Sequence, residues 1–224
     1  MQTFFLEDEQ DVNAFKLTLS DARLTSYLRT TNGDQKGAIN LYYWNTILAM
    51  SLYQSLQMWE IALRNKLNQF LCWKFNTNWP FDERRAVRQL AGAEKRKLRE
   101  AVARLQDSNN GQLVTTGAVV ADLSAGFWVS LLGSAYDIPF SWRYNLVRKI
   151  FPNDETLDRD QASEICGKLL DLRNRVAHHE PIHHLDVQAR KTDIDRLLKA
   201  MCPVAEKFAK TGCAFDVVWA ARPT

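Results

Sequence analysis

The feature that most constrains the fold is an apolar stripe within residues 38–75. Large apolar residues recur there at spacings of three and four, namely Leu41, Trp44, Leu48, Leu52, Leu56, Trp59 and Leu63. This spacing places them on one face of an α-helix. The β-branched alternation that would indicate strands is almost absent from the rest of the chain. The sequence therefore predicts an all-α protein.

Further helical segments flank this stretch. They are expected at residues 8–30, about 82–107, 118–134, 141–150, about 156–180 and about 185–210. Asp82 is a candidate N-cap for the helix at about 82–107. Pro181 ends the helix at about 156–180, because proline restricts the residue before it. No repeat or long linker divides the chain, so we expect a single domain over residues 1–224.

Basic residues are concentrated in one region. The net charge of +3 is too small to indicate nucleic acid, but residues 84–104 hold eight Lys/Arg against two Glu. A solvent-exposed helix face is the commoner meaning of such a run, and a surface that follows phosphates is the alternative. The candidates for RNA binding are Arg84, Arg85, Arg88, Lys95, Arg96, Lys97 and Arg99.

The cellular location of the protein is predicted from its cysteines, its N-terminal segment and its apolar segments. The four cysteines are scattered, and the N-terminal "MQTFFLEDEQ" lacks the basic start and apolar core of a signal peptide. The densest apolar segment, residues 41–63, is interrupted by Asn45, Gln54, Gln57 and Glu60, so a membrane span is not expected. These features favour a cytoplasmic protein with reduced thiols.

The segment "LRNRVAHHEPIHH", residues 172–184, contains all four histidines of the chain. In helical projection Leu169, Leu172 and Val176 form the core-facing stripe, whereas Asn174 and His178 lie one turn apart on the opposite side. Arg173 flanks Asn174. A solvated helix end explains the positive charge, which favours the helix dipole. It does not explain an asparagine in mid-helix, nor four histidines within seven positions.

A metal site is one interpretation of the histidines. His179 and His183 are four residues apart, but Pro181 interrupts the helix that would align them. No acidic or cysteine partner has a zinc-like spacing. We therefore expect neither a metal nor another cofactor, and we expect His183 and His184 to lie in a loop.

RNA cleavage is the second interpretation. It needs a base for the 2′-hydroxyl, a cation for the charge of the transition state and an acid for the 5′-oxygen. Histidine and arginine suit these tasks. One histidine cannot easily be both base and acid, so motif helices from two chains would complete the site. A face with Gly167, Leu170, Asn174 and Ala177 suits such a two-fold contact.

Three blocks of the sequence resemble a known family. "RNRVAHHE" resembles the R-N-x3-H motif of the HEPN superfamily, and residues 42–67 and 121–132 resemble blocks of its Abi-like (abortive infection) branch. The resemblance implies a dimerising helical bundle that acts as a metal-independent endoribonuclease in phage defence or as a toxin. Arg173 would then stabilise the scissile phosphate, His178 would act as base or acid, and Asn174 would orient one of them. His179 would support them or provide an alternative register.

Several alternatives stay open. Glu60 and Arg64 are either an intrahelical ion pair or supports of Arg173 or RNA near the cleft. The protein is either the nuclease or a non-catalytic HEPN-type module that binds RNA or protein, and a metal-dependent hydrolase is a weaker third interpretation. RNA and a second copy are the expected partners, and an antitoxin or regulatory RNA is a possible one.

Overall fold

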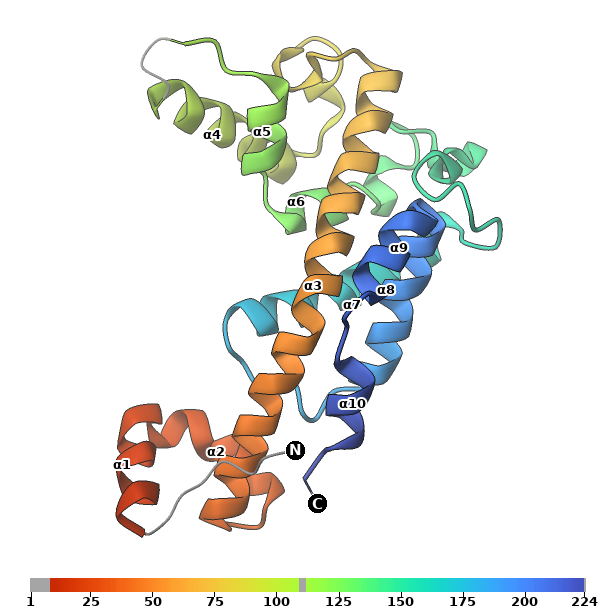
Figure 1. Cartoon of the computed structure of the whole chain (residues 1–224). Coiled ribbons are helices and arrows are strands. Elements are labelled where there is room, and N and C mark those ends of the chain that lie inside the picture. Colours follow the sequence, from red (N-terminus) through yellow and green to blue (C-terminus); the bar gives the residue numbers. More distant parts are fainter. Residues whose placement is uncertain (1–8, 109–111, 224) are drawn as a thin grey trace.

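The long central helix organises the molecule. The computed structural model describes residues 9–108 and 112–223, which contain ten α-helices and no strand. Helix α3 (Gln35–Lys74) has 40 residues, a length of about 60 Å at 1.5 Å per residue, and runs along most of the molecule (Figure 1). All seven residues of the predicted stripe are buried. The all-α prediction is confirmed for the described residues.

The N-terminal segment forms two helices instead of the predicted one. Helices α1 (Glu9–Leu19) and α2 (Asp21–Thr30) are separated by Ser20, whose φ of 70° lies in the left-handed region. A left-handed residue cannot continue a right-handed helix, so the chain changes direction there. Leu24 and Tyr27 of α2 are buried against the core.

The basic segment also differs from its prediction. The carboxylate of Asp82 accepts a hydrogen bond from the Arg85 backbone N–H at 3.0 Å, which closes a turn where a helix N-cap was expected. Two short 3-10 turns follow one another, η1 (Trp79–Phe81) and η2 (Val87–Gln89). Helix α4 (Gly92–Ser108) begins only after Leu90, which is extended. Arg84, Arg85 and Arg88 therefore lie outside the helix.

The apolar segment at 118–134 is not one helix. It is divided into α5 (Thr116–Asp122) and α6 (Ala125–Ser130), because Leu123 and Ser124 between them are extended. The 3-10 turn η3 (Ser134–Tyr136) follows. The helix predicted at 141–150 is replaced by η4 (Trp142–Tyr144) and η5 (Leu146–Lys149). Asn145 joins these two turns with a φ of 63°, and this left-handed residue prevents a continuous helix.

The C-terminal part contains four helices. They are α7 (Arg159–Ala177), α8 (Val187–Met201), α9 (Pro203–Lys210) and α10 (Phe215–Ala220). A capping box of Asp158 and Gln161 starts α7. The predicted helix at 185–210 is split because Pro203 forces an extended conformation on Cys202, with φ −164° and ψ 108°.

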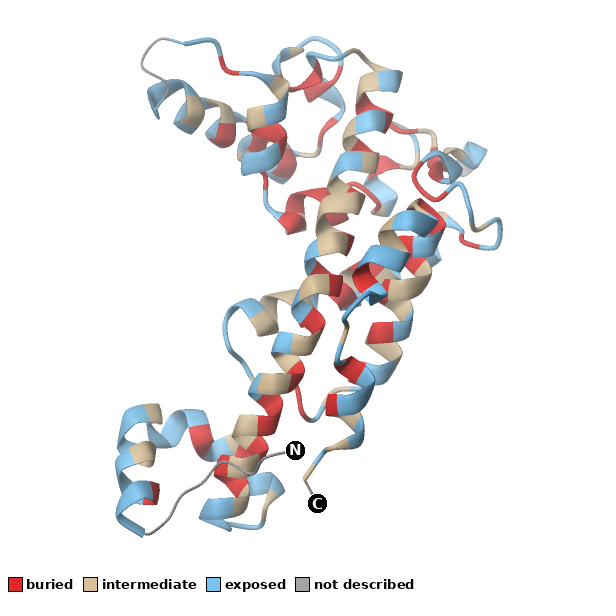
Figure 2. Ribbon diagram, viewed as in Figure 1, coloured by how far each residue is buried: buried red, intermediate tan, exposed pale blue. Residues whose placement is uncertain are grey.

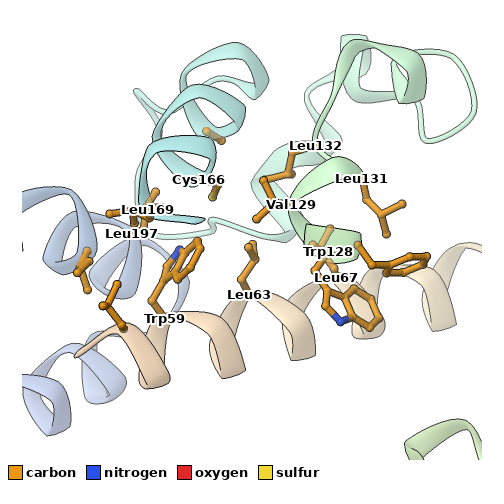
Figure 3. Packing of buried hydrophobic residues seen from close by; sticks show 14 of the residues in the cluster. Trp59, Leu63, Leu67, Trp128, Val129, Leu131, Leu132, Cys166, Leu169 and Leu197 are labelled. Carbon is orange, nitrogen blue, oxygen red and sulfur yellow. The ribbon is translucent and has the colours of Figure 1, made fainter. Parts of the chain in front are cut away.

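The core lies along α3. Buried residues form a cluster that follows one side of α3 and continues into the elements packed on it (Figure 2). At its centre Trp59 and Leu63 of α3 lie close to Cys166 of α7 and Leu197 of α8, and Trp128 of α6 lies further along α3 beside Leu67 (Figure 3). This packing fixes α7 against the middle of α3.

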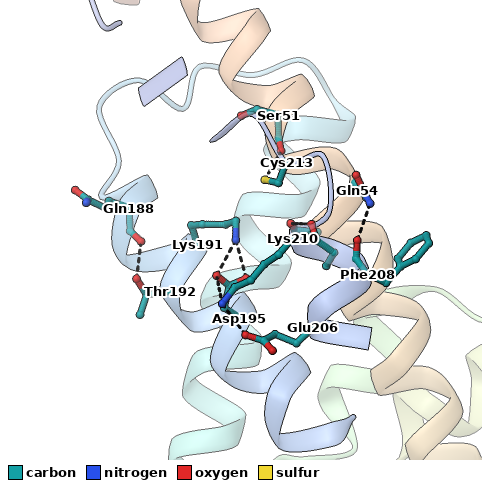
Figure 4. Close-up of polar contacts among 12 residues, drawn as sticks. Ser51, Gln54, Gln188, Lys191, Thr192, Asp195, Glu206, Phe208, Lys210 and Cys213 are labelled. Atoms are coloured by element: carbon teal, nitrogen blue, oxygen red, sulfur yellow. Dashed lines mark hydrogen bonds and ion pairs between the residues drawn. The ribbon is translucent and has the colours of Figure 1, made fainter. Parts of the chain in front are cut away.

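A polar network joins α8 and α9. The buried ammonium of Lys191 contacts both carboxylate oxygens of Asp195, at 2.6 and 2.7 Å, and Lys210 of α9 reaches Asp195 at 3.7 Å (Figure 4). The amide of Gln54 on α3 donates to the Phe208 carbonyl at 3.0 Å.

In the described part of the chain, no helix combines the length and apolarity needed to cross a membrane.

Candidate active site

Arg173 is fixed between two helices. Its Nε donates to Oε2 of Glu60 on α3 at 2.8 Å, and its Nη2 lies 3.5 Å from Oε1 of the same carboxylate. Its Nη1 lies 3.4 Å from Oδ1 of the neighbouring Asn174. The side chains of Arg173 and Glu60 are 36% and 24% exposed, so the pair is partly shielded from water. The two-point contact orients the guanidinium.

A groove lies beside this pair. It has a volume of about 750 Å³ and runs between α3 and the C-terminal end of α7. Its lining includes Arg173, Glu60 and His179. Its α3 wall includes Met50 and Tyr53, which are 67% and 62% exposed. A guanidinium, a carboxylate and an imidazole thus share one cavity with an apolar wall.

His179 forms the turn that ends α7. The His179 N–H donates to the Val176 carbonyl and the Glu180 N–H to the Arg175 carbonyl, at 3.2 and 2.8 Å. This is a Schellman motif, whose left-handed position usually holds glycine. Here His179 occupies it with a φ of 57°. Nη1 of Arg23, on α2, donates to the His179 carbonyl at 2.6 Å and holds the turn.

His178 and Asn174 do not belong to the lining of the groove. His178 is exposed and caps α7, with its N–H donating to the Asn174 carbonyl at 2.9 Å. Asn174 lines a second hollow of about 630 Å³ together with Arg175 and Arg190. Among the described residues, His178 belongs to the lining of neither hollow. The predicted trio is therefore brought together only in part, through the contact of Arg173 with Asn174.

Of the two residues singled out on α3, Glu60 lies at the site. It pairs with Arg173, which is one of the two alternatives that the sequence left open. Arg64 lies one turn further along. Its Nε is buried and has no hydrogen-bond partner among the described residues.

The loop after α7 contains a histidine whose burial the sequence did not predict. His183 is 2% exposed, its Nε2 lies 3.2 Å from the Thr30 hydroxyl, and its ring lies 4.7 Å from that of Tyr27. Burial, with smaller contributions from His184 and Arg222, lowers the pKa of His183 to about 4. His183 and His184 do lie in a loop, as expected, but only His184 is exposed.

Asn45 anchors this loop. Its side-chain oxygen accepts hydrogen bonds from the backbone N–H groups of Ile182 and His183, at 2.8 and 3.0 Å. Asn45 is only 4% exposed. A polar residue next to Trp44 within the apolar stripe was the available signal, because a buried amide needs partners. In the sequence alone, Asn45 serves only as an argument against a membrane span.

The predicted basic surface divides into two sets. On α4, Arg96, Lys97 and Arg99 form ion pairs with Glu100, Glu94 and Glu83. The Glu83 pKa is lowered by its hydrogen bond with Arg99 and, more weakly, by Lys95. Arg84, Arg85 and Arg88 are exposed and have no ion-pair partner among the described residues.

The described residues were searched for metal-binding groups, and the sequence was compared with known proteins. Within residues 9–108 and 112–223, no group of three or more His, Cys, Asp or Glu is arranged to hold a metal ion. No family model matches the sequence, and no curated protein or solved structure is significantly similar to it. The resemblance to the HEPN superfamily therefore rests on the three sequence blocks alone.

Proposed function

We propose that this protein is an endoribonuclease that cleaves RNA without a metal ion, at a site built on Arg173, Asn174 and His178 and completed by a second copy of the chain. The observation that carries the proposal is the position of Arg173, whose guanidinium is oriented by Glu60 beside a groove that also contains His179. His178 is exposed at the end of the same helix, where a second chain can reach it.

The reaction would proceed by attack of the RNA's own 2′-oxygen. A histidine accepts the 2′-hydroxyl proton while the bond from O2′ to phosphorus forms, and the bond from phosphorus to O5′ breaks. The histidine of the second chain donates a proton to the departing O5′. Arg173 stabilises the negative charge that develops on the phosphate oxygens. The products are a 2′,3′-cyclic phosphate and a 5′-hydroxyl.

The first test uses the wild-type protein with EDTA present. We expect a fluorescent RNA oligonucleotide to be cleaved and the same sequence with 2′-deoxy sugars to stay intact, because the deoxy strand lacks the nucleophile. Gel electrophoresis and mass spectrometry of the fragments measure this. Arg173→Ala should lose the activity. Arg175→Ala is the matched control, because Arg175 lies on the same helix and pairs with Glu180, which follows that helix. Cleavage that needs an added metal would contradict the proposal.

The second test concerns the dimer. A Cβ added at Gly167 on α7 would meet nothing within 4 Å, so the single chain has room for a side chain there. Replacing a helix-interior glycine also favours the helix by roughly 0.5–1 kcal/mol. If two copies pair through this face of α7, Gly167→Gln should keep the melting temperature and convert dimer to monomer. Light scattering after size exclusion measures the mass, and a dimer that survives the substitution would place the interface elsewhere.

A non-catalytic role is the second candidate, and one observation favours it. The guanidinium of Arg173 already contacts Glu60 and Asn174, so a phosphate must compete with a carboxylate for it. A protein that binds RNA in a salt-dependent manner and yields no fragments would fit this role. A function in phage defence, with an antitoxin or regulatory RNA, rests on the family resemblance. Expression of wild type beside His178→Ala, scored for growth and intact cellular RNA, addresses it.

A further inference from the structure

A second cationic site lies where α3 ends. Lys74, in the last turn of α3, shares a hollow of about 420 Å³ with Arg84, Arg85 and Arg88 from the turns before α4. Phe75, Ile138 and Pro139 supply apolar lining. No carboxylate belongs to this lining among the described residues. Four cations therefore line one small volume whose described lining carries no negative charge.

Helix α4, which follows these turns, is also rich in cations, but most of them are paired with acids. Four of the five cations of α4 form ion pairs with acids, as in the contact of Arg99 with Glu83 at 2.6 Å and that of Arg104 with Asp122 at 2.6 Å. In the hollow, Lys74 donates a hydrogen bond to the Ser141 hydroxyl at 3.4 Å and lies 6.0 Å from the Phe75 ring centre, and it forms no ion pair with any described residue. Like charges held together repel, and a bound anion relieves the repulsion.

The shape of the hollow indicates the kind of anion. Its volume corresponds to on the order of ten water molecules at about 30 Å³ each, which is more than one phosphate group needs. Arg84, Arg85 and Arg88 are all exposed, and arginine contacts phosphate through its planar fork. An enclosed cradle of buried donors would suit a single ion, whereas open arginines in a row suit a chain of phosphates.

We propose that this hollow binds the phosphodiester backbone of a nucleic-acid strand. Free phosphate carries the same charge and oxygen acceptors as the strand, and competition between the two ligands distinguishes them. Lys74 follows Glu60 by 14 residues on α3, which is about 20 Å along the axis and within about 40° in projection. A strand in the hollow could thus extend along α3 towards Arg173. Only this link to cleavage rests on the proposed function.

The test measures binding with a strand that cannot be cleaved by 2′-hydroxyl attack. Fluorescence anisotropy follows a labelled 20-nucleotide oligodeoxythymidylate with wild type, with the hollow variant Arg84→Gln/Arg85→Gln/Arg88→Gln, and with the control variant Arg96→Gln/Lys97→Gln/Arg99→Gln. Both variants change the net charge equally. We expect the hollow variant to bind at least tenfold more weakly and to lower the salt slope by about 2, at about 0.7 for each phosphate that is no longer neutralised. The control should stay within about threefold.

Other results would overturn the proposal. If both variants lose affinity equally, the effect is due to net charge alone. If the hollow variant binds as tightly as wild type, the hollow is not a binding site for the strand. Inorganic phosphate that displaces the probe as well as unlabelled strand, at equal phosphate concentration, would assign the hollow to the free ion. Circular dichroism confirms folding of each variant, and the single changes Lys74→Gln and Arg88→Gln give a second measurement if the triple variant does not fold. Because the probe is not cleaved, absence of nuclease activity leaves this result intact.

Discussion

Replacing His178 and His179 together by asparagine is expected to slow RNA cleavage by about 10²- to 10⁴-fold, the usual contribution of general acid and base groups. Asparagine removes the imidazoles but tolerates the left-handed conformation that His179 adopts with a φ of 57°. The turn after α7 should therefore persist. Single-turnover cleavage of a labelled RNA measures the effect, and circular dichroism and thermal melting confirm the fold. Unchanged cleavage would contradict the proposed active site.

The two single variants separate two architectures of the site. His178 is exposed at the helix end, whereas His179 shares the groove with Arg173. For a site completed by a second chain we expect His178→Asn to lose at least 100-fold and His179→Asn less than tenfold. The reverse ranking would locate the chemistry within the groove of one chain. His184→Asn is the matched control, because this exposed histidine lies beyond Pro181.

The helical class of the fold could be predicted because it depends on one dominant pattern. The stripe from Leu41 to Leu63 requires a long helix with a buried face, and α3 supplies it. The breaks could not be predicted in the same way. Ser20 and Asn145 have positive φ values of 70° and 63° although both are exposed, and the apolar periodicity of the sequence carries no signal of such positions. Only the break at Pro203 had a local cause that the sequence displays.

The candidate site was predictable to the extent that it depends on spacing within one helix. Arg173 and Asn174 are adjacent on α7 and point about 100° apart, so their contact depends on the length of the arginine side chain. The pairing of Glu60 with Arg173 was one of two open alternatives, and no spacing rule could decide between them, because the two residues are 113 positions apart. The separation of the cations into a paired and an unpaired set depends on acids from other segments, such as Glu83 and Asp122. Composition alone cannot make that distinction.

Acid should destabilise the protein through His183, and the direction follows from the pKa values. The pKa of His183 is about 4 in the folded chain and 6.5 as its ordinary value, so between these pH values the unfolded chain binds one proton more. The stabilisation is complete above pH 6.5 and is lost as the pH falls towards 4. We expect a slope of about 1.4 kcal/mol per pH unit, and a total of about 3 kcal/mol. Urea unfolding at a series of pH values measures it.

The substitution His183→Phe tests whether His183 causes the loss of stability in acid. A phenyl ring can keep the contact with Tyr27, and it removes Nδ1, which is buried without a hydrogen-bond partner among the described residues. The Thr30 hydroxyl still has the Ser26 carbonyl, at 3.1 Å, as acceptor. The variant should therefore fold at neutral pH and lose most of the slope between pH 5 and 6.5, above the range in which carboxylates titrate. His184→Gln should keep most of the slope. A slope that persists in His183→Phe would assign the acid sensitivity to another group.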